Sequence, residues 1–176
     1  MPGEMKFVVD CMLGKLAKWL KILGFDAVFV NEAEDRELLH LARREKRILL
    51  TKDYELFAAA ARLPRLFIES EDWPEQVAQV LEAFRLRPWA RPHSRCLACN
   101  VELKKIPRRL ARNLVAPFVF ERAASFAICP ECGRVFWPGT HFEDMDRKIA
   151  RILGKKKERP KTRLKTEREA GRRPKE

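Results

Sequence analysis

Apolar and polar positions follow two different patterns within residues 7–26, FVVDCMLGKLAKWLKILGFD. A short apolar run that ends at Asp10 predicts a buried strand, and the residues up to Gly24 follow the helical period of about 3.6. The apolar stripe of this helix consists of Leu13, Leu16, Ala17, Leu20 and Leu23. The positions on its opposite side are Lys15, Lys18 and Lys21. The stretch therefore predicts a strand that ends in a carboxylate and then an amphipathic helix with a basic face.

The strand–helix pattern recurs through the first half of the chain. Further strands are predicted over residues 26–30, 47–53 and 65–70, and each is followed by a segment whose apolar residues have helical spacing. Strands that alternate with helices of this length form parallel sheets with right-handed crossovers. We therefore expect an α/β fold, with a four-stranded parallel sheet of order 2-1-3-4 flanked by helices.

Three carboxylates follow predicted strands at what becomes one edge of this sheet. Asp10 and Asp53 end the first and third strands, which are neighbours in the predicted order. Asp35 lies just past the second strand, either as the cap or in the first turn of the next helix. Asp26 precedes its strand and is expected at the opposite edge. The weaker candidates for a further acid, past the fourth strand, are Glu69 and Asp72.

Carboxylates that share a cleft repel one another unless a cation neutralises them. Oxygen ligands without a nearby histidine suit Mg²⁺ or Mn²⁺, which can activate water for phosphodiester hydrolysis. The sequence has neither GxxxxGK[ST] nor GxGxxG, so nucleotide binding through those loops has no support. The alternative interpretation is that three capping and turn residues lie near each other without a ligand.

Charge points to a polyanionic partner. The 176 residues have a net charge of +12, and residues 154–176 alone contain eleven Lys or Arg and four Glu. RNA or DNA is favoured over an anionic membrane, because no amphipathic Trp- or Phe-rich helix accompanies this tail. The alternative is a tail that only keeps the protein soluble. No apolar run approaches the roughly 18 residues of a membrane span, and no export signal is visible, so we expect a soluble, cytoplasmic protein.

Four of the five cysteines form two CxxC pairs. Without an export signal, such pairs hold a metal more often than a disulfide. The four, Cys96, Cys99, Cys129 and Cys132, have the two-knuckle spacing of a zinc ribbon, and a site of four thiolates is structural rather than catalytic. The apolar run over residues 114–120 between the pairs predicts a strand. The basic residues of this insert, which either follow a phosphate backbone or form a solvated face, are Lys104, Lys105, Arg108, Arg109 and Arg112.

Several single residues are interpreted as packing positions. Trp137 and Phe142 are expected to pack the ribbon against the first domain, and His141 to be a packing residue rather than a ligand. Cys11 is expected to be a small buried side chain. A helix over residues 143–153 closes the ordered part, and the residues after it are expected to be disordered when free.

These motifs together resemble a known family. FVVDCMLGKLAKWLKILGFD, DRELLHLA and RILLTKD, followed by CPEC and FWPGTHF, look like the PIN-like ribonuclease domain of the Mut-seven C-terminal type with its fused zinc ribbon. The resemblance implies a PIN-like fold and metal-dependent ribonuclease activity. Matched residue by residue, it implies Asp10, Asp35 and Asp53 as the acids, with Thr51 in the TxD element. The fourth acid of many PIN domains has no clear counterpart.

We therefore expect an endoribonuclease in which Asp10, Asp35 and Asp53 hold Mg²⁺ or Mn²⁺ and orient the attacking water. Thr51 and the helix lysines Lys15 and Lys18 are expected to contact the RNA. Zinc, held by the four cysteines, is the structural cofactor. The alternative is a non-catalytic RNA- or ribosome-binding protein on the same scaffold, because a fold alone does not establish activity.

The chain is expected to divide into three parts. A PIN-like nuclease domain occupies residues 1–90, and a zinc ribbon with its basic insert and closing helix occupies residues 91–153. Residues 154–176 form a basic tail that aids RNA binding. RNA is the expected partner. A ribosome or another ribonucleoprotein is the wider assembly in which the protein would meet this RNA.

Overall fold

The structure of the chain is a computed structural model that describes residues 5–139 and 141–154. The predicted basic tail lies, except for its first residue, outside the described residues. None of the described helices is both long and apolar enough to cross a membrane.

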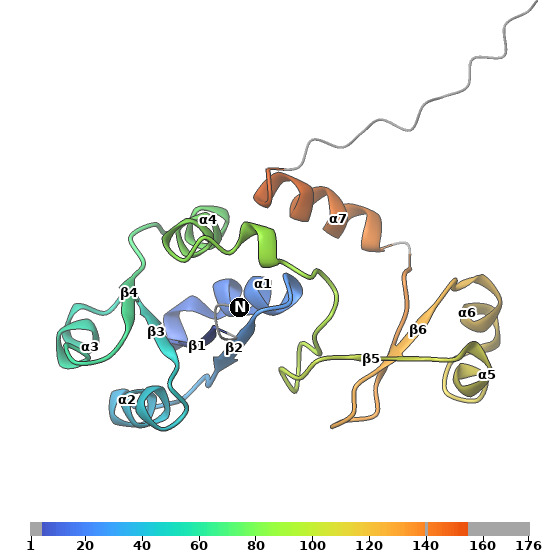
Figure 1. Ribbon diagram of the computed structural model, residues 1–176, viewed down its shortest axis with the longest axis horizontal. Helices are drawn as coiled ribbons and strands as arrows, with labels where there is room; N and C mark the ends of the chain where they lie inside the picture. Colours follow the sequence, from blue (N-terminus) through green and yellow to red (C-terminus); the bar gives the residue numbers. More distant parts are fainter. Residues whose placement is uncertain (1–4, 140, 155–176) are drawn as a thin grey trace, which may run out of the picture.

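A four-stranded parallel sheet organises the first part of the chain (Figure 1). Its strands, in the order in which they occur in the chain, are β1 (Lys6–Val9), β2 (Asp26–Phe29), β3 (Ile48–Thr51) and β4 (Arg65–Phe67). The spatial order is β2-β1-β3-β4, and all three pairings are parallel. The predicted α/β class and strand order are therefore confirmed, and β1 and β3 are neighbours at the centre.

Helices cover both faces of this sheet. They are α1 (Gly14–Ile22), α2 (Asp35–Arg44), α3 (Tyr54–Ala59) and α4 (Trp73–Ala83). The inward side chains Val9 and Leu50 share one core with α1 and α4, whereas their neighbours Val8 and Leu49 share another with α2 and α3. Figure 1 shows α4 on one side of the sheet and α2 on the other. Both faces of the central strands are thus buried, as their continuous apolar sequences require.

The cysteine-containing part is a separate antiparallel sheet. Its strands are β5 (Lys104–Ile106), β6 (Phe126–Ile128) and β7 (Val135–Phe136), in the order β5-β6-β7. Two short helices, α5 (Arg108–Ala111) and α6 (Pro117–Arg122), connect β5 to β6. The strand predicted over residues 114–120 is wrong, because α6 occupies most of this run and Pro117 lies in its first turn, where the missing N–H has no intrahelical partner.

The ribbon has a small core of its own. The side chains of Ala111, Val119, Ala123 and Phe126 are buried there. Trp137 packs against this cluster and not, as expected, between the ribbon and the first domain. The side chains of His141 and Phe142 lie outside the described residues.

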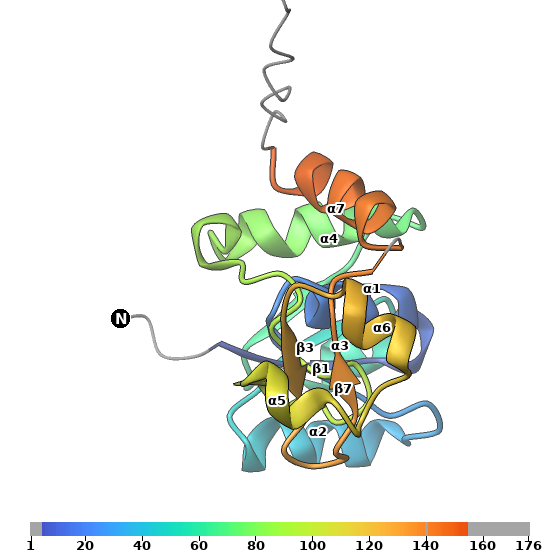
Figure 2. The same ribbon diagram turned by 90° about the vertical axis from the view of Figure 1, so that its right-hand side faces the viewer.

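The last helix returns to the first sheet. Helix α7 (His141–Ile152) lies alongside α4 (Figure 2), and Ile149 and the following Leu153 are buried in the core shared by α1 and α4. His93 Nε2 lies 3.0 Å from Asp146 Oδ1, which ties α7 to the segment that leads into the ribbon. The closing helix therefore packs on the sheet-containing unit although it follows the ribbon in sequence.

The first cysteine knuckle docks on the amino edge of the four-stranded sheet. Asn100 accepts a hydrogen bond from the Ala27 N–H (3.1 Å) and donates one to the Asp26 carboxylate (2.7 Å). Arg47 also donates to the same Asp26 oxygen, at 2.5 Å. Asp26 is thus a structural acid at the edge opposite the predicted site, where sequence reasoning placed it.

Candidate active site and metal centre

Asp10 is held firmly at the carboxyl edge of the sheet. It directly follows β1, and its N–H donates to the Leu50 carbonyl oxygen of β3 at 3.0 Å. Its side chain is only 4% exposed, and Oδ2 accepts a 2.7 Å hydrogen bond from the hydroxyl of the fully buried Thr51. A buried carboxylate needs such a partner, and this one comes from the neighbouring strand.

The same hydroxyl positions Asp53. Thr51 Oγ1 accepts from the Asp53 N–H at 2.9 Å while it donates to Asp10. Asp53 in turn caps α3, because its Oδ1 accepts from the backbone N–H groups of Glu55 (2.7 Å) and Leu56 (2.9 Å). Its other oxygen, Oδ2, has no hydrogen bond from the described residues and is available to a ligand. The structure thus links two predicted acids through the predicted threonine.

Asp35 has a different environment. It is the first residue of α2 and is exposed, while a capping box between Glu34 and Glu37 satisfies the helix start. Asp10, Asp35 and Asp53 do not form a group with all oxygens close together. Among groups of three or more His, Cys, Asp or Glu in the described residues, only the four cysteines have ligand atoms that all lie within 4.8 Å of one another. The separated positions of the three acids suit an ion that takes one or two carboxylates and keeps several waters.

The side chains that follow Asp10 agree only in part with the exposure expected from the sequence. Lys15 and Lys18 are exposed on α1, but Lys21 donates to the Leu97 carbonyl oxygen at 2.9 Å, and burial lowers its pKa. Cys11 is exposed, which corrects the expectation of a buried side chain, because a turn of 3₁₀ helix directs it outward after β1. Hydrogen bonding to the Asp10 carboxylate raises the pKa of this thiol, so it stays protonated.

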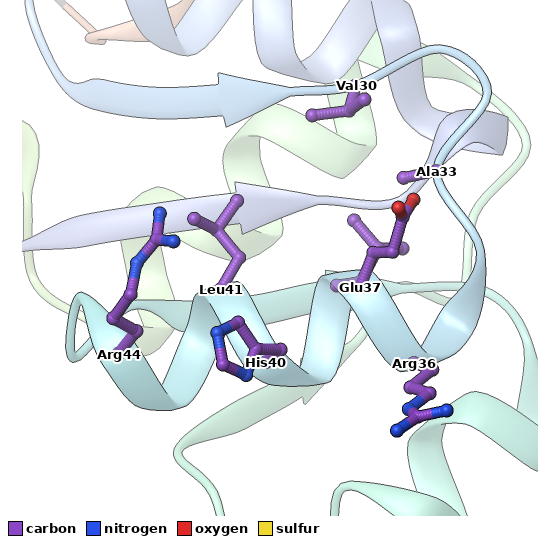
Figure 3. A pocket seen from close by; sticks show the side chains of 8 residues that line it. Val30, Ala33, Arg36, Glu37, His40, Leu41 and Arg44 are labelled. Atoms are coloured by element: carbon purple, nitrogen blue, oxygen red, sulfur yellow. The ribbon is translucent and has the colours of Figure 1, made fainter.

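A cavity of about 450 Å³ lies between α2 and the end of β2 (Figure 3). Glu37, Leu41 and Arg44 point from α2 toward Val30, whereas Arg36 points away from it. Its lining combines apolar side chains with two arginines, a glutamate and a histidine. Neither Asp10 nor Asp53 is among the lining residues, so the cavity is separate from the candidate site.

Sequence reasoning missed Tyr54, the only tyrosine of the chain. It directly follows Asp53 and is 75% exposed, with its ring stacked on Phe67 at a centroid distance of 4.3 Å. The signal available in the sequence was an aromatic residue immediately after the TxD element. Its exposure could not be read there, because it depends on the position of Phe67 on β4.

The basic residues of the ribbon insert fall into two groups. Arg108 is used internally: it donates to the Phe120 and Ala123 carbonyl oxygens, and its guanidinium lies 4.4 Å from the centre of the Phe120 ring. The side chains of the others are exposed and make no hydrogen bond or ion pair within the described part of the chain; they are Lys104, Lys105, Arg109 and Arg112. Only this second group is available to a phosphate backbone.

The four cysteines form one compact cluster. The Sγ atoms of Cys96 and Cys132 are 3.9 Å apart, close to the roughly 3.8 Å edge of a tetrahedron with metal–sulfur bonds of about 2.3 Å. Burial disfavours the Cys129 thiolate, but backbone N–H groups of Cys132 and Glu131 outweigh it and lower the pKa of this thiol to about 7. The donor set and spacing fit a single tetrahedral metal ion.

Both knuckles use the same turn. The residue after the second cysteine of each pair has a positive φ, 59° at Asn100 and 70° at Gly133, and its N–H donates to the carbonyl oxygen of the first cysteine. Glycine and asparagine adopt this conformation most readily. The same backbone turn therefore shapes both cysteine pairs.

Comparison with known proteins agrees with this architecture. The family model described as the Mut7-C RNAse domain matches residues 5–149. A human protein named "Exonuclease mut-7 homolog" is 33% identical over 117 residues, which cover 62% of this chain but only 13% of that protein. The chain thus corresponds to a small part of this relative. No solved structure matches. With a match over most of its length, the chain belongs to the Mut7-C RNAse domain family.

Proposed function

We propose that this protein is a metal-dependent ribonuclease that hydrolyses internal RNA phosphodiester bonds. The observation that carries the proposal is the Asp10–Thr51–Asp53 link at the carboxyl edge of neighbouring parallel strands, where open α/β sheets bind their ligands. Family membership supports a nuclease, and the human relative's name refers to an exonuclease. Endonucleolytic cleavage is our proposal for this chain.

The residues that would hold Mg²⁺ or Mn²⁺ are Asp10, Asp35 and Asp53. When bound, the ion supplies a more acidic water and neutralises charge on the phosphate. Asp10 is fixed by Thr51 and offers its Oδ1 oxygen, and Asp53 offers Oδ2. Asp35, exposed at the start of α2, would be the third acid that holds the ion. Together the carboxylates orient the attacking water beside the scissile phosphate.

Basic side chains would position the RNA. Lys15 and Lys18 are exposed on α1, which begins soon after Asp10, and they would guide the scissile strand toward the acids. The exposed lysines and arginines of the ribbon insert and the tail over residues 154–176 would add contacts to phosphates. The tail's contribution is electrostatic and independent of sequence.

Zinc is the proposed occupant of the four-cysteine site. Four thiolates close the coordination shell, so its role is to hold the two knuckles and the ribbon together. Asn100 connects the first knuckle to the amino edge of the first sheet through its hydrogen bonds to Asp26 and Ala27. The zinc and the acids therefore act at opposite edges of the sheet.

A non-catalytic RNA-binding protein, within a ribosome or ribonucleoprotein, is the second candidate. It is favoured by one observation, namely that the oxygens of the three acids do not gather as the cysteine sulfurs do. Such a protein would keep the basic surfaces and bind RNA without cleaving it.

Cleavage of labelled single-stranded RNA, with and without Mn²⁺, separates the two candidates. We expect Asp10→Asn and Asp53→Asn to lower the cleavage rate by roughly 100-fold or more, while RNA affinity changes little. Asp144→Asn, in the exposed first turn of α7, is the matched control and should cleave normally. Metal-independent cleavage, or equal rates for all variants, would refute the proposal. Binding without cleavage by the wild type would favour the second candidate.

A further inference from the structure

Exposed apolar side chains of the first sheet unit gather at one edge. Within residues 5–86, the large apolar side chains that are exposed are Met12, Val30 and Tyr54, at 65%, 41% and 75%. Each lies within three residues of the carboxyl end of β1, β2 or β3. This is the edge that carries Asp10 and Asp53. These exposed apolar side chains therefore share the sheet edge of the candidate active site and are not scattered over the unit.

Tyr54 is the most exposed of the three and is held in a fixed orientation. Its ring stacks on Phe67 with an interplanar angle of 28°. Phe67 is in turn fixed by an edge contact with Phe57 (centroids 5.5 Å apart), and the Arg65 guanidinium lies 4.0 Å from the centre of the Phe57 ring. One face of the tyrosine is thus covered and the other faces solvent. Little conformational entropy remains to be lost when a planar ligand stacks on it.

The fold places this ring beside the acids. Thr51 and Phe67 are register partners on β3 and β4, and Asp53 and Tyr54 are consecutive at the start of α3. The backbone bonds that fix the Asp53 carboxylate as the cap of α3 therefore also fix the origin of the Tyr54 side chain. A nucleotide whose phosphate lies at Asp53 has its own or a neighbouring base within reach of the ring.

We propose that the exposed face of Tyr54 is a stacking subsite for a base of the RNA strand whose phosphodiester lies at Asp10 and Asp53. The inference rests on the proposed ribonuclease function and adds a substrate-positioning residue to it. Stacking on an aromatic ring tolerates any base, because every base has a π-face. The subsite would therefore fix the position of the strand along the site without selecting a sequence.

The test measures RNA affinity by fluorescence anisotropy in the full-length, zinc-loaded Asp10→Asn protein, which keeps the RNA intact. Tyr54→Ala should weaken binding roughly 5- to 150-fold, the range expected for the loss of one base–aromatic stack. Tyr54→Phe keeps the ring and should bind like its parent. Trp89→Ala is the matched control, since Trp89 is an aromatic side chain with 54% exposure on the 3₁₀ turn Arg87–Trp89, after α4.

A series of RNAs, each with one abasic position, locates the base. For one position the affinities of the parent and Tyr54→Ala proteins should become equal, because the stacked base is missing in both complexes. Equal affinity of parent and Tyr54→Ala for the complete RNA would overturn the inference, as would equal losses in Tyr54→Phe. Tyr54→Leu, which still covers Phe67 but has no π-face, should bind as weakly as Tyr54→Ala; binding like the parent would also overturn it.

The two proposals fail in different ways. If Tyr54→Ala binds normally while the wild type cleaves RNA in a metal-dependent manner, only the stacking subsite is wrong. If the wild type does not cleave RNA but the ring still contributes to binding, the ribonuclease proposal is wrong and the base contact stands.

Discussion

Thr51→Val tests the link between the two strands most sharply. The substitution keeps the shape of a fully buried, β-branched side chain and removes only its hydroxyl. The lost bond to the Asp10 carboxylate, 2.7 Å long, is of the kind worth about 1.5–3 kcal/mol. The lost bond from the Asp53 N–H adds about 0.5–1.5 kcal/mol. Because Asp10 is only 4% exposed, water cannot easily replace the hydroxyl, and we expect a total of about 2–4.5 kcal/mol.

The matched control is Thr51→Ser, which keeps the hydroxyl and loses one methyl group, at a cost of about 1 kcal/mol. Urea unfolding of the zinc-loaded proteins, followed by tryptophan fluorescence, gives both free energies if the slopes agree. We also expect Thr51→Val to lower the cleavage rate more than RNA affinity, because the acids remain but their relative position loosens. A Thr51→Val protein as stable as Thr51→Ser would refute the reasoning.

Three further predictions concern the ribbon and the basic helix. Gly24→Ala should destabilise the protein by about 2–4 kcal/mol in the same urea assay, because φ is 93° and the new Cβ would lie 2.4 Å from the Arg91 carbonyl oxygen. The control is Gly154→Ala, where φ is 70° and the nearest atom to the new Cβ is 4.0 Å away. It should cost only about 1–2 kcal/mol. Chelation of the metal should remove hydrogen-exchange protection from residues 93–139 while β1 to β4 stay protected, and simultaneous loss in both parts would contradict this division. Charge reversal at Lys15 and Lys18 should weaken RNA binding, reduce turnover, and lower the log–log salt slope by about 0.7 for each lost phosphate contact, whereas an unchanged slope would show an ordinary solvated helix face.

The central part of the fold could be predicted from sequence because its strands differ in burial. The runs at β1 and β3 are continuously apolar, and both are buried on two faces at the centre of the sheet. Strands β2 and β4 are less completely buried and lie at the edges. Once β1 and β3 are neighbours, Asp10 and Asp53 must share an edge, since parallel strands end on the same side.

Features that depend on contacts between distant residues could not be predicted. The apolar run over residues 114–120 fits a strand or a helix equally well. The helix α6 is favoured because its side chains pack against Phe126. The return of α7 to the first core requires Ile149 to find a site that no local pattern specifies. Asn100 follows a cysteine pair in sequence, yet its side chain bonds to the start of β2.

The placement of the candidate site residues was predicted in part, while their roles in binding and catalysis stay predictions. Thr51 was selected for its place in the TxD element, and the structure adds the reason, a hydroxyl that serves Asp10 and Asp53 at once. Asp35 stays a prediction, because its exposed position at the start of α2 leaves its contact with an ion to be tested. Tyr54 depends on Phe67, which is brought to it by the pairing of β3 and β4.

The most direct measurement of the central claim compares a linear single-stranded RNA with a closed circle of the same sequence, each incubated with zinc-loaded protein and Mn²⁺. We expect the wild type to cut both, because an endonuclease needs no free end, and Asp10→Asn and Asp53→Asn to cut neither. Cleavage that persists in these variants, or an absence of cleavage of both RNAs by the wild type with Mn²⁺, would contradict a ribonuclease at this site. Degradation of the linear RNA alone would contradict its endonucleolytic action.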